Sequence, residues 1–135
     1  AIVRYPKDIG TGAKITQNLD LKVGQSRCII KGKKIVILNF GALLPIAVEV
    51  AEKFNATVID MRFVKPLDTS IIEDVVKSHN IIVTLEENVV IGGAGSGVNE
   101  YLVMNDLSCK IKVRNIGLPD CYQNHGGRAD EIKPA

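Results

Sequence analysis

The residues with the greatest chemical potential are a pair of carboxylates beside a glycine-rich loop. Glu86, Glu87 and Asn88 follow an apolar run, and four of the six residues from Gly92 to Gly97 are glycines. A helical pattern begins within this loop. A strand, a turn and a glycine-rich helix entry form the place where α/β proteins often hold anions on unpaired backbone N–H groups. The stretch is therefore a candidate phosphate-binding loop.

Two features of the same stretch argue against phosphate. The loop contains no lysine and lacks the spacing of a P-loop. The acidic pair just upstream would also repel a bound phosphate by several kcal/mol. We favour a close-packed helix entry in which the glycines admit a neighbouring backbone. The structural or interface candidates are Glu86, Glu87, Asn88, Gly92, Gly93 and Gly95.

The two glutamates are not expected to act as an acid/base pair. Adjacent residues on a strand point to opposite faces, so we expect one of Glu86 and Glu87 to cap or pair locally and the other to face a partner. His79, at a predicted helix end, and His125, in the tail, have no recognisable nucleophile beside them. No catalytic residue is predicted.

Arg4 is the remaining candidate for a binding role. The segment Arg4-Tyr5-Pro6 reads as the exit from a preceding domain, where an arginine can hold a phosphate through two parallel hydrogen bonds. From the residues alone, a surface ion pair is the favoured reading of Arg4. Three dispersed cysteines predict reduced thiols in a cytoplasmic protein, with neither a metal site nor a disulfide framework.

Composition sets the class of protein. A chain of 135 residues with 46% hydrophobic and 24% charged residues fits one globular domain. The net charge of +2, with scattered basic residues and few aromatics, gives no support for nucleic-acid binding. No apolar run reaches the roughly 20 residues of a membrane span. The start lacks an initiator Met and a signal-peptide layout, so the sequence reads as the middle of a longer protein.

Hydrophobic periodicity places the elements that must position these residues. Two β-rich runs around Gly32 predict an antiparallel hairpin. After it, apolar runs typical of buried strands alternate with helical patterns, and the last strand alternates as an edge strand does. Strands are expected at 27–31, 34–40, 57–61, 80–85 and 110–114, and helices at 41–55, 68–79 and 96–105. The order predicts an α/β three-layer open sandwich with a mostly parallel five-stranded sheet and one antiparallel strand.

Side-chain spacing adds detail to two of the helices. The buried face of helix 41–55 is expected to use apolar residues at helical spacing, namely Leu43, Ala47, Val50, Ala51 and Phe54. Asp68 or Ser70 is expected to cap helix 68–79, after a structured loop in which charges pair around Asp60 and Arg62.

Several of these stretches together resemble a known family. Residues 60–68 (DMRFVKPLD), 84–88 (TLEEN) and 92–100 (GGAGSGVNE) are similar to the C-terminal domain of the 1-deoxy-D-xylulose-5-phosphate synthases. Residues 39–45 (NFGALLP) and 115–120 (NIGLPD) fit as well, and the resemblance covers about residues 1–120. It implies domain limits of 1–25 for the end of the preceding pyrimidine-binding domain and a linker, 26–120 for a transketolase C-terminal-like domain, and 121–135 for an atypical tail.

The resemblance also implies a function for the longer protein. Members of this family are homodimeric transferases that use thiamine diphosphate and Mg²⁺ to condense pyruvate with glyceraldehyde 3-phosphate, for isoprenoid and thiamine biosynthesis. This chain lacks their Gly-Asp-Gly cofactor motif, so neither cofactor nor metal is expected on it, and its own role is packing against the other domains and dimerisation. Arg4 matches a substrate-phosphate arginine of the family. Lys7 stands where members have a second arginine; it would keep the positive charge but lose the planar guanidinium that makes two parallel hydrogen bonds.

Two alternatives remain at this point. The first is a stand-alone small-molecule or nucleotide-binding module that uses the Gly92–Gly97 loop. The second is the equivalent domain of a 2-oxo-acid dehydrogenase, since those domains keep versions of 65–68 (KPLD) and of the Glu86-Glu87 pair.

Overall fold

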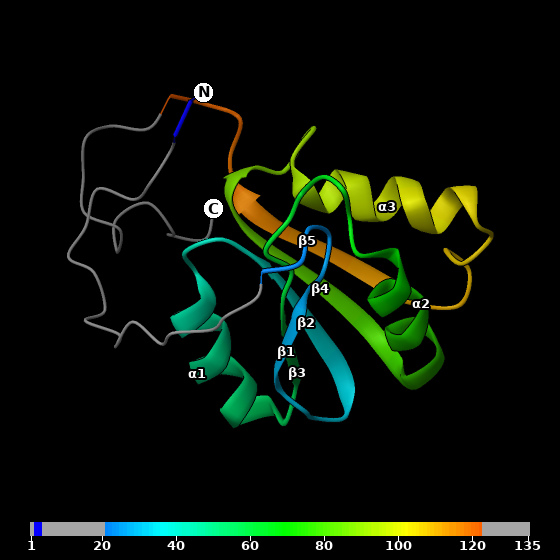
Figure 1. Ribbon diagram of the computed structural model, residues 1–135. Coiled ribbons are helices and arrows are strands. Elements are labelled where there is room, and N and C mark those ends of the chain that lie inside the picture. Colours follow the sequence, from blue (N-terminus) through cyan, green and yellow to red (C-terminus); the bar gives the residue numbers. More distant parts are fainter. Residues whose placement is uncertain (1, 4–20, 123–135) are drawn as a thin grey trace.

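A computed structural model describes residues 2–3 and 21–122 of the chain. In that part the chain forms five strands and three helices that alternate after the first two strands (Figure 1). The elements are β1 (Arg27–Ile30), β2 (Lys34–Phe40), α1 (Leu44–Phe54), β3 (Thr57–Asp60), α2 (Thr69–Ser78), β4 (His79–Val89), α3 (Ala94–Met104) and β5 (Lys112–Leu118).

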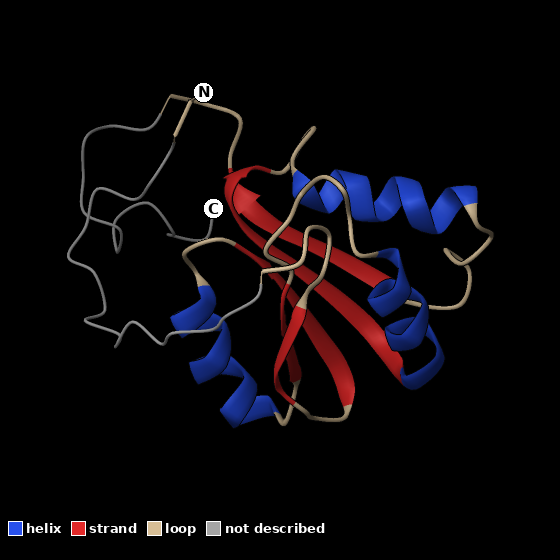
Figure 2. Cartoon of the chain, viewed as in Figure 1, coloured by secondary structure: helices blue, strands red, loops and turns tan. Residues whose placement is uncertain are grey.

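The strands form one sheet in the order β1-β3-β2-β4-β5. Strands β3, β2, β4 and β5 run parallel, and β1 is antiparallel to its neighbour β3. The predicted α/β class, the mostly parallel five-stranded sheet and the edge position of the last strand are confirmed. Helix α1 covers one face of the sheet, and α2 and α3 cover the other (Figures 1 and 2).

The predicted hairpin between the first two strands is wrong. Strand β1 pairs with β3, and β2 lies between β3 and β4. The turn between β1 and β2 binds to the α1–β3 loop instead: the Gly32 N–H donates to Thr57 Oγ1 (3.0 Å) and the Lys33 N–H to the Asn55 carbonyl (2.8 Å). A Cβ at Gly32 would overlap the Ala56 backbone, so this close approach requires glycine. Strand β2, apolar on both faces, is left free to take two parallel neighbours.

Helix α1 buries a narrower face than its spacing predicts. Leu43, Ala47 and Ala51 are buried, as expected. Val50 and Phe54 are wrong as core residues, because their exposures are 38% and 66%. The helix packs on β1, β2 and β3 through small side chains, so only a thin stripe of it is covered.

Asp68 caps α2, and Ser70 supports it. The Asp68 carboxylate accepts hydrogen bonds from the Ile71 N–H (3.4 Å), the Ser70 hydroxyl (2.7 Å) and the Ser26 N–H (2.8 Å). Burial alone would raise the pKa of Asp68, but these hydrogen bonds together lower it below its ordinary value. The Ser26 bond ties the segment entering β1 to the start of α2.

The loop before α2 contains the predicted charge pairing. Asp60 forms ion pairs with Arg62 (3.9 Å) and, across the β1–β3 ladder, with Arg27 (3.3 Å). The Lys65–Pro66 peptide bond in this loop is cis.

Candidate interaction site at the carboxyl edge of the sheet

The acidic pair lies within β4, which continues four residues past its predicted end at Leu85 and so includes Asn88 and Val89. Alternation along this strand separates the two carboxylates. Ile82, Thr84 and Glu86 are buried on the side of α3, whereas Glu87 is half-buried and points to the side of α1. The prediction that the two glutamates face opposite ways is confirmed.

Glu86 fills the N-terminus of α3. Glu86 is 3% exposed, and its carboxylate accepts hydrogen bonds from the N–H groups of Ala94 (2.7 Å) and Gly95 (2.9 Å). The residue at the N-cap position, Gly93, has no side chain to bond these groups. A carboxylate at a helix N-terminus also interacts favourably with the helix dipole. Glu86 therefore caps the helix from the preceding strand and is the glutamate that pairs locally.

The glycines of the loop make room for this carboxylate. A Cβ at Gly93 would overlap the Glu86 carboxylate and the Val89 carbonyl oxygen. A Cβ at Gly95 would lie 2.5 Å from Thr84 Oγ1 and 3.0 Å from Asn115 Cγ. The close-packed helix entry is thus the arrangement found: Gly93 admits both the backbone carbonyl of Val89 and the Glu86 side chain, and Gly95 admits the side chains of Thr84 and Asn115. The helix begins at Ala94, two residues earlier than predicted.

The rest of the loop is held by hydrogen bonds between its own residues. Gly92 has a φ of 72°, which favours glycine. Its N–H donates to Ser96 Oγ (3.1 Å), and the Ser96 hydroxyl donates to the Val90 carbonyl (2.9 Å). Asn88 and Gly92 are exposed, and Ile91 at the loop tip is 76% exposed. The loop tip thus exposes a large apolar side chain to solvent. A role for these residues in an interface stays a prediction.

The arrangement does not suit a phosphate. The N–H groups of Ala94 and Gly95, which a phosphate would need, already bond Glu86, and the carboxylate occupies the position of the anion. A phosphate would have to displace a buried negative charge. The structure therefore favours the helix-entry interpretation over the phosphate-binding one.

Sequence reasoning missed three buried polar side chains near this edge. Asn39 and Thr84 are fully buried, and Asn115 is the partner of Thr84 across the β4–β5 ladder. Asn39 Oδ1, Thr84 Oγ1 and Asn115 Oδ1 have no hydrogen-bond partner, although Asn39 Nδ2 donates to the Gly41 carbonyl (2.8 Å). The sequence does contain a signal for these three residues, because each is a polar residue inside or beside an apolar run that predicts a strand.

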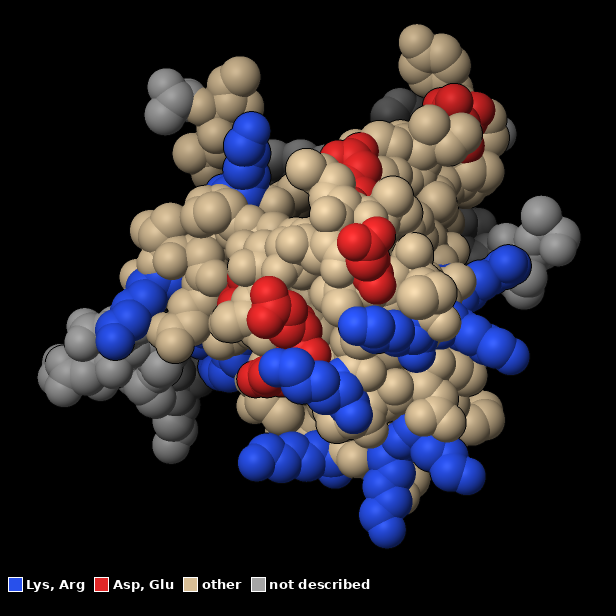
Figure 3. All heavy atoms as spheres, turned by 90° about the vertical axis from the view of Figure 1, so that its right-hand side faces the viewer, with Lys and Arg blue, Asp and Glu red and all other residues tan. Residues whose placement is uncertain are grey.

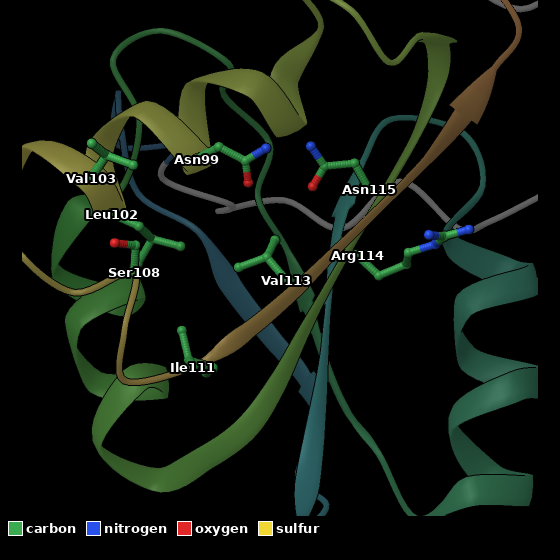
Figure 4. Close-up of a pocket in the computed structure, with 8 residues that line it drawn as sticks. All are labelled: Asn99, Leu102, Val103, Ser108, Ile111, Val113, Arg114 and Asn115. Carbon is green, nitrogen blue, oxygen red and sulfur yellow. The ribbon is translucent and has the colours of Figure 1, made fainter.

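A groove of about 450 Å³ lies between α3 and the edge strand β5. Asn99 of α3 and Asn115 of β5 point toward each other at one end, and Leu102, Ile111 and Val113 line it further along (Figure 4). Arg114, its one charged lining residue, extends from β5 toward the side where α1 lies (Figure 4). The groove has neither a carboxylate nor a histidine for acid/base chemistry.

The other candidate residues do not join this site. His79 is the C-cap of α2 and the first residue of β4; its Nε2 is hydrogen-bonded to Thr57 Oγ1 (2.7 Å) and its Nδ1 to Ser78 Oγ (2.9 Å). Arg4, Lys7 and His125 lie outside the described residues. The three cysteines are exposed and none is in a disulfide. Residues 2–3 and 21–122 contain no group of three or more His, Cys, Asp or Glu residues placed to hold a metal ion.

Charges on the visible surface are mixed. In Figure 3 basic side chains lie mainly over the lower half of the face shown, and acidic ones gather in its middle and upper parts. No helix among the described residues is long and apolar enough to cross a membrane.

Fold and site together define an open α/β domain in which a buried glutamate caps the helix that follows its strand. Comparison with known proteins specifies the family: residues 24–133 match the model of the transketolase C-terminal domain, and the chain belongs to that family.

Relatives with known names agree with this assignment. The chain is 60% identical over 126 residues to the 1-deoxy-D-xylulose-5-phosphate synthase of Francisella tularensis subsp. novicida (strain U112) and 59% identical over 126 residues to that of subsp. mediasiatica (strain FSC147). Each match covers 93% of this chain and 20% of the relative. The chain thus spans about a fifth of the length of the curated relatives it matches.

A solved structure supports the fold. A split-gene transketolase, described as an inactive β4 tetramer, superimposes with a TM-score of 0.70 at 29% identity. The similarity covers 78% of this chain and 36% of the other.

Proposed function

We propose that this chain is the C-terminal part of a 1-deoxy-D-xylulose-5-phosphate synthase. The observation that carries the proposal is 60% identity to such an enzyme across 93% of the chain. The full-length protein would be a transketolase-type transferase that condenses pyruvate with glyceraldehyde 3-phosphate and releases carbon dioxide. It would serve isoprenoid and thiamine biosynthesis as a cytoplasmic homodimer.

Thiamine diphosphate, with Mg²⁺, would supply the carbanion chemistry of this reaction. The described residues do not fit either group. They contain no acidic cluster for a metal, and the helix N-terminus that could receive a diphosphate is filled by Glu86. We therefore assign cofactor binding to the other domains and derive no step through the cofactor here.

The domain's own work is packing and dimerisation. In support, the carboxyl edge presents an exposed loop tip at Ile91, and Ser96 hydrogen-bonds the residues on either side of it, Val90 and Gly92. Arg4 and Lys7 remain the proposed ligands of the substrate phosphate. An Arg at position 4 would bind it through two parallel bonds, and Lys7 would contribute a point charge.

The alternatives have less support. A nucleotide-binding module would need the backbone N–H groups that Glu86 already occupies. For a 2-oxo-acid dehydrogenase domain, no observation in the fold outweighs the named relatives.

A domain exchange tests the proposal. Residues 1–135 replace the matching C-terminal region of the Francisella enzyme, and product formation from pyruvate and glyceraldehyde 3-phosphate is measured with thiamine diphosphate and Mg²⁺. We expect activity within about tenfold of the parent. A folded chimera that binds the cofactor but forms no product would contradict the assignment. The same region from a distant transketolase, at about 30% identity, is the matched control and should not support product formation.

A further inference from the structure

Lysines that are dispersed in the sequence come together at the amino edge of the sheet, where the four parallel strands begin. Helices α1, α2 and α3 end at this edge, because each returns the chain from the end of one strand to the start of the next. The antiparallel β1 also ends there and turns into β2. The strand starts, connections and last helical turns of this edge carry exposed lysines, which we call the amino-edge lysines: Lys31, Lys33, Lys34, Lys53, Lys77, Lys110 and Lys112.

Most of the amino-edge lysines have no carboxylate to neutralise them. Lys53 and Lys77 form ion pairs with carboxylates on their own helices (2.7 and 3.4 Å). None of the others forms an ion pair with a residue in 2–3 or 21–122. Four spacings of about 4.8 Å separate the outer strands, so these charges share an edge only about 20 Å long and form a positive field. Basic side chains accordingly predominate in the lower half of the face in Figure 3, and the parallel strands begin in the lower part of Figure 1.

Two large apolar side chains border the amino-edge lysines. Phe54 is 66% exposed at the end of α1, and the next residue, Asn55, accepts a hydrogen bond from the Lys33 N–H (2.8 Å). Met104 is 82% exposed at the end of α3, in the connection that leads to Lys110. Because α1 and α3 cover opposite faces of the sheet, apolar groups flank the lysines on both sides (Figures 1 and 2).

We propose that the amino edge binds the surface of an anionic lipid bilayer. Clustered lysines are attracted to anionic head groups. Exposed apolar side chains beside them can enter the boundary between head groups and acyl chains. The amino edge presents both kinds of group on one side of the domain. The proposal does not need the enzyme activity proposed above.

The residue types favour a bilayer over an acidic protein or a nucleic acid. The positive charge of this edge comes from lysines, which carry point charges on flexible stems and are depleted from protein interfaces. Arg27 and Arg62, which could grip a carboxylate with two parallel bonds, are instead paired with Asp60 at the end of β3. A nucleic acid also binds lysines, but base stacking needs aromatic side chains, and Phe54 is the one exposed aromatic among the described residues of this edge.

Vesicle co-sedimentation of the 135-residue chain tests the charge contribution. The probes are phosphatidylcholine vesicles with and without about 30% phosphatidylserine. The variant carries Lys33→Glu and Lys110→Glu, and the matched control carries Lys22→Glu and Lys65→Glu, which change the net charge equally at exposed positions of the opposite edge. A lysine near an anionic surface contributes about fivefold to the binding constant, so the variant should bind at least about 25-fold more weakly, whereas the control should change by less than about threefold.

A tryptophan reporter tests the apolar contact. The chain contains no Trp, so Phe54→Trp adds a single indole at this edge. In anionic vesicles that contain brominated lipid, we expect its emission to fall by at least about half. The matched control is Ile91→Trp, since Ile91 is 76% exposed at the carboxyl edge, and its emission should not change.

The outcomes distinguish the possible partners. Preference for anionic vesicles, weaker binding of the Lys33→Glu/Lys110→Glu variant and quenching of Phe54→Trp support the proposal. Equal binding of the two double variants, or no binding to anionic vesicles, would overturn it. Binding without quenching that a short DNA duplex competes away would assign the edge to nucleic acid instead. The Francisella chimera should bind the same vesicles, and its failure to do so would overturn the proposal for the whole enzyme.

Circular dichroism of each variant checks that the chain remains folded. If Lys33→Glu with Lys110→Glu unfolds it, Lys31→Glu with Lys112→Glu replaces that variant, with the same expectations.

Discussion

Replacing Glu86 by Ala tests the central feature of the carboxyl edge. The substitution leaves the N–H groups of Ala94 and Gly95 buried without an acceptor. Each such group costs about 1–3 kcal/mol, so we expect a loss of about 4 kcal/mol in the free energy of unfolding. That is a large part of the roughly 5–15 kcal/mol typical of a domain. Glu86→Gln, which keeps one acceptor oxygen but loses the charge, should cost about 2 kcal/mol.

The assay is urea unfolding followed by circular dichroism. The matched control is Glu100→Ala, an exposed glutamate on the same helix, which should change stability by less than about 0.5 kcal/mol. Because the helix N-terminus would then lack its anion, 100 mM formate should stabilise Glu86→Ala more than the control. A loss for Glu86→Ala no larger than that for Glu100→Ala would refute the capping role. Equal effects of formate on the two variants would refute the inference that the N-terminus of α3, once it lacks the Glu86 carboxylate, binds an anion.

Three further predictions concern local contacts. Asp68→Ala should cost about 1–2 kcal/mol at pH 7. Because hydrogen bonds lower the folded-state pKa of Asp68, this contribution is present above its ordinary pKa and disappears as the pH falls through the lowered folded-state pKa, so the stabilities of wild type and variant should converge in acid. Gly95→Ala should destabilise the chain by about 2 kcal/mol, because the added methyl group would overlap buried neighbours. Gly97→Ala, in open space on the same helix, should be neutral or stabilising by up to about 1 kcal/mol. Equal thermal midpoints for these two variants would contradict this prediction. Thr57→Val removes the acceptor of the Gly32 N–H and the partner of His79 and should cost about 1–2 kcal/mol, whereas Thr57→Ser should retain most of the stability in the same unfolding assay.

Local patterns predicted most of the fold. The continuous apolar runs of β2 and β3 marked buried parallel strands, and alternation marked β5 as an edge. The hairpin failed because the choice of strand partner is not local. A short connection around Gly32 is compatible with pairing to β2, and only the bonds to Thr57 and Asn55 direct β1 elsewhere.

The site was predictable only in outline. The acidic pair beside a glycine loop indicated a cap and a tight helix entry, and alternation required the two glutamates to diverge. Which glutamate turns inward depends on the register of β4 against β2 and β5, which no local pattern contains. Val50 and Phe54 share helical spacing with the buried residues of α1 but are exposed, because helical spacing shows that a face is apolar and does not show whether a neighbour in this part of the chain covers it.

The position of Glu86 in the chain also bears on the order of folding. It meets Ala94 and Gly95 only eight and nine residues further on, whereas the Arg27–Asp60 contact joins residues 33 positions apart. Short loops close with less entropy loss than long ones, so the unit of β4 and α3 should form before β1 docks on β3. Replacing Glu86 should then slow refolding, and removing the Arg27–Asp60 pair should mainly speed unfolding. The contact that caps α3 in the native state would therefore also influence the rate at which the sheet assembles during folding.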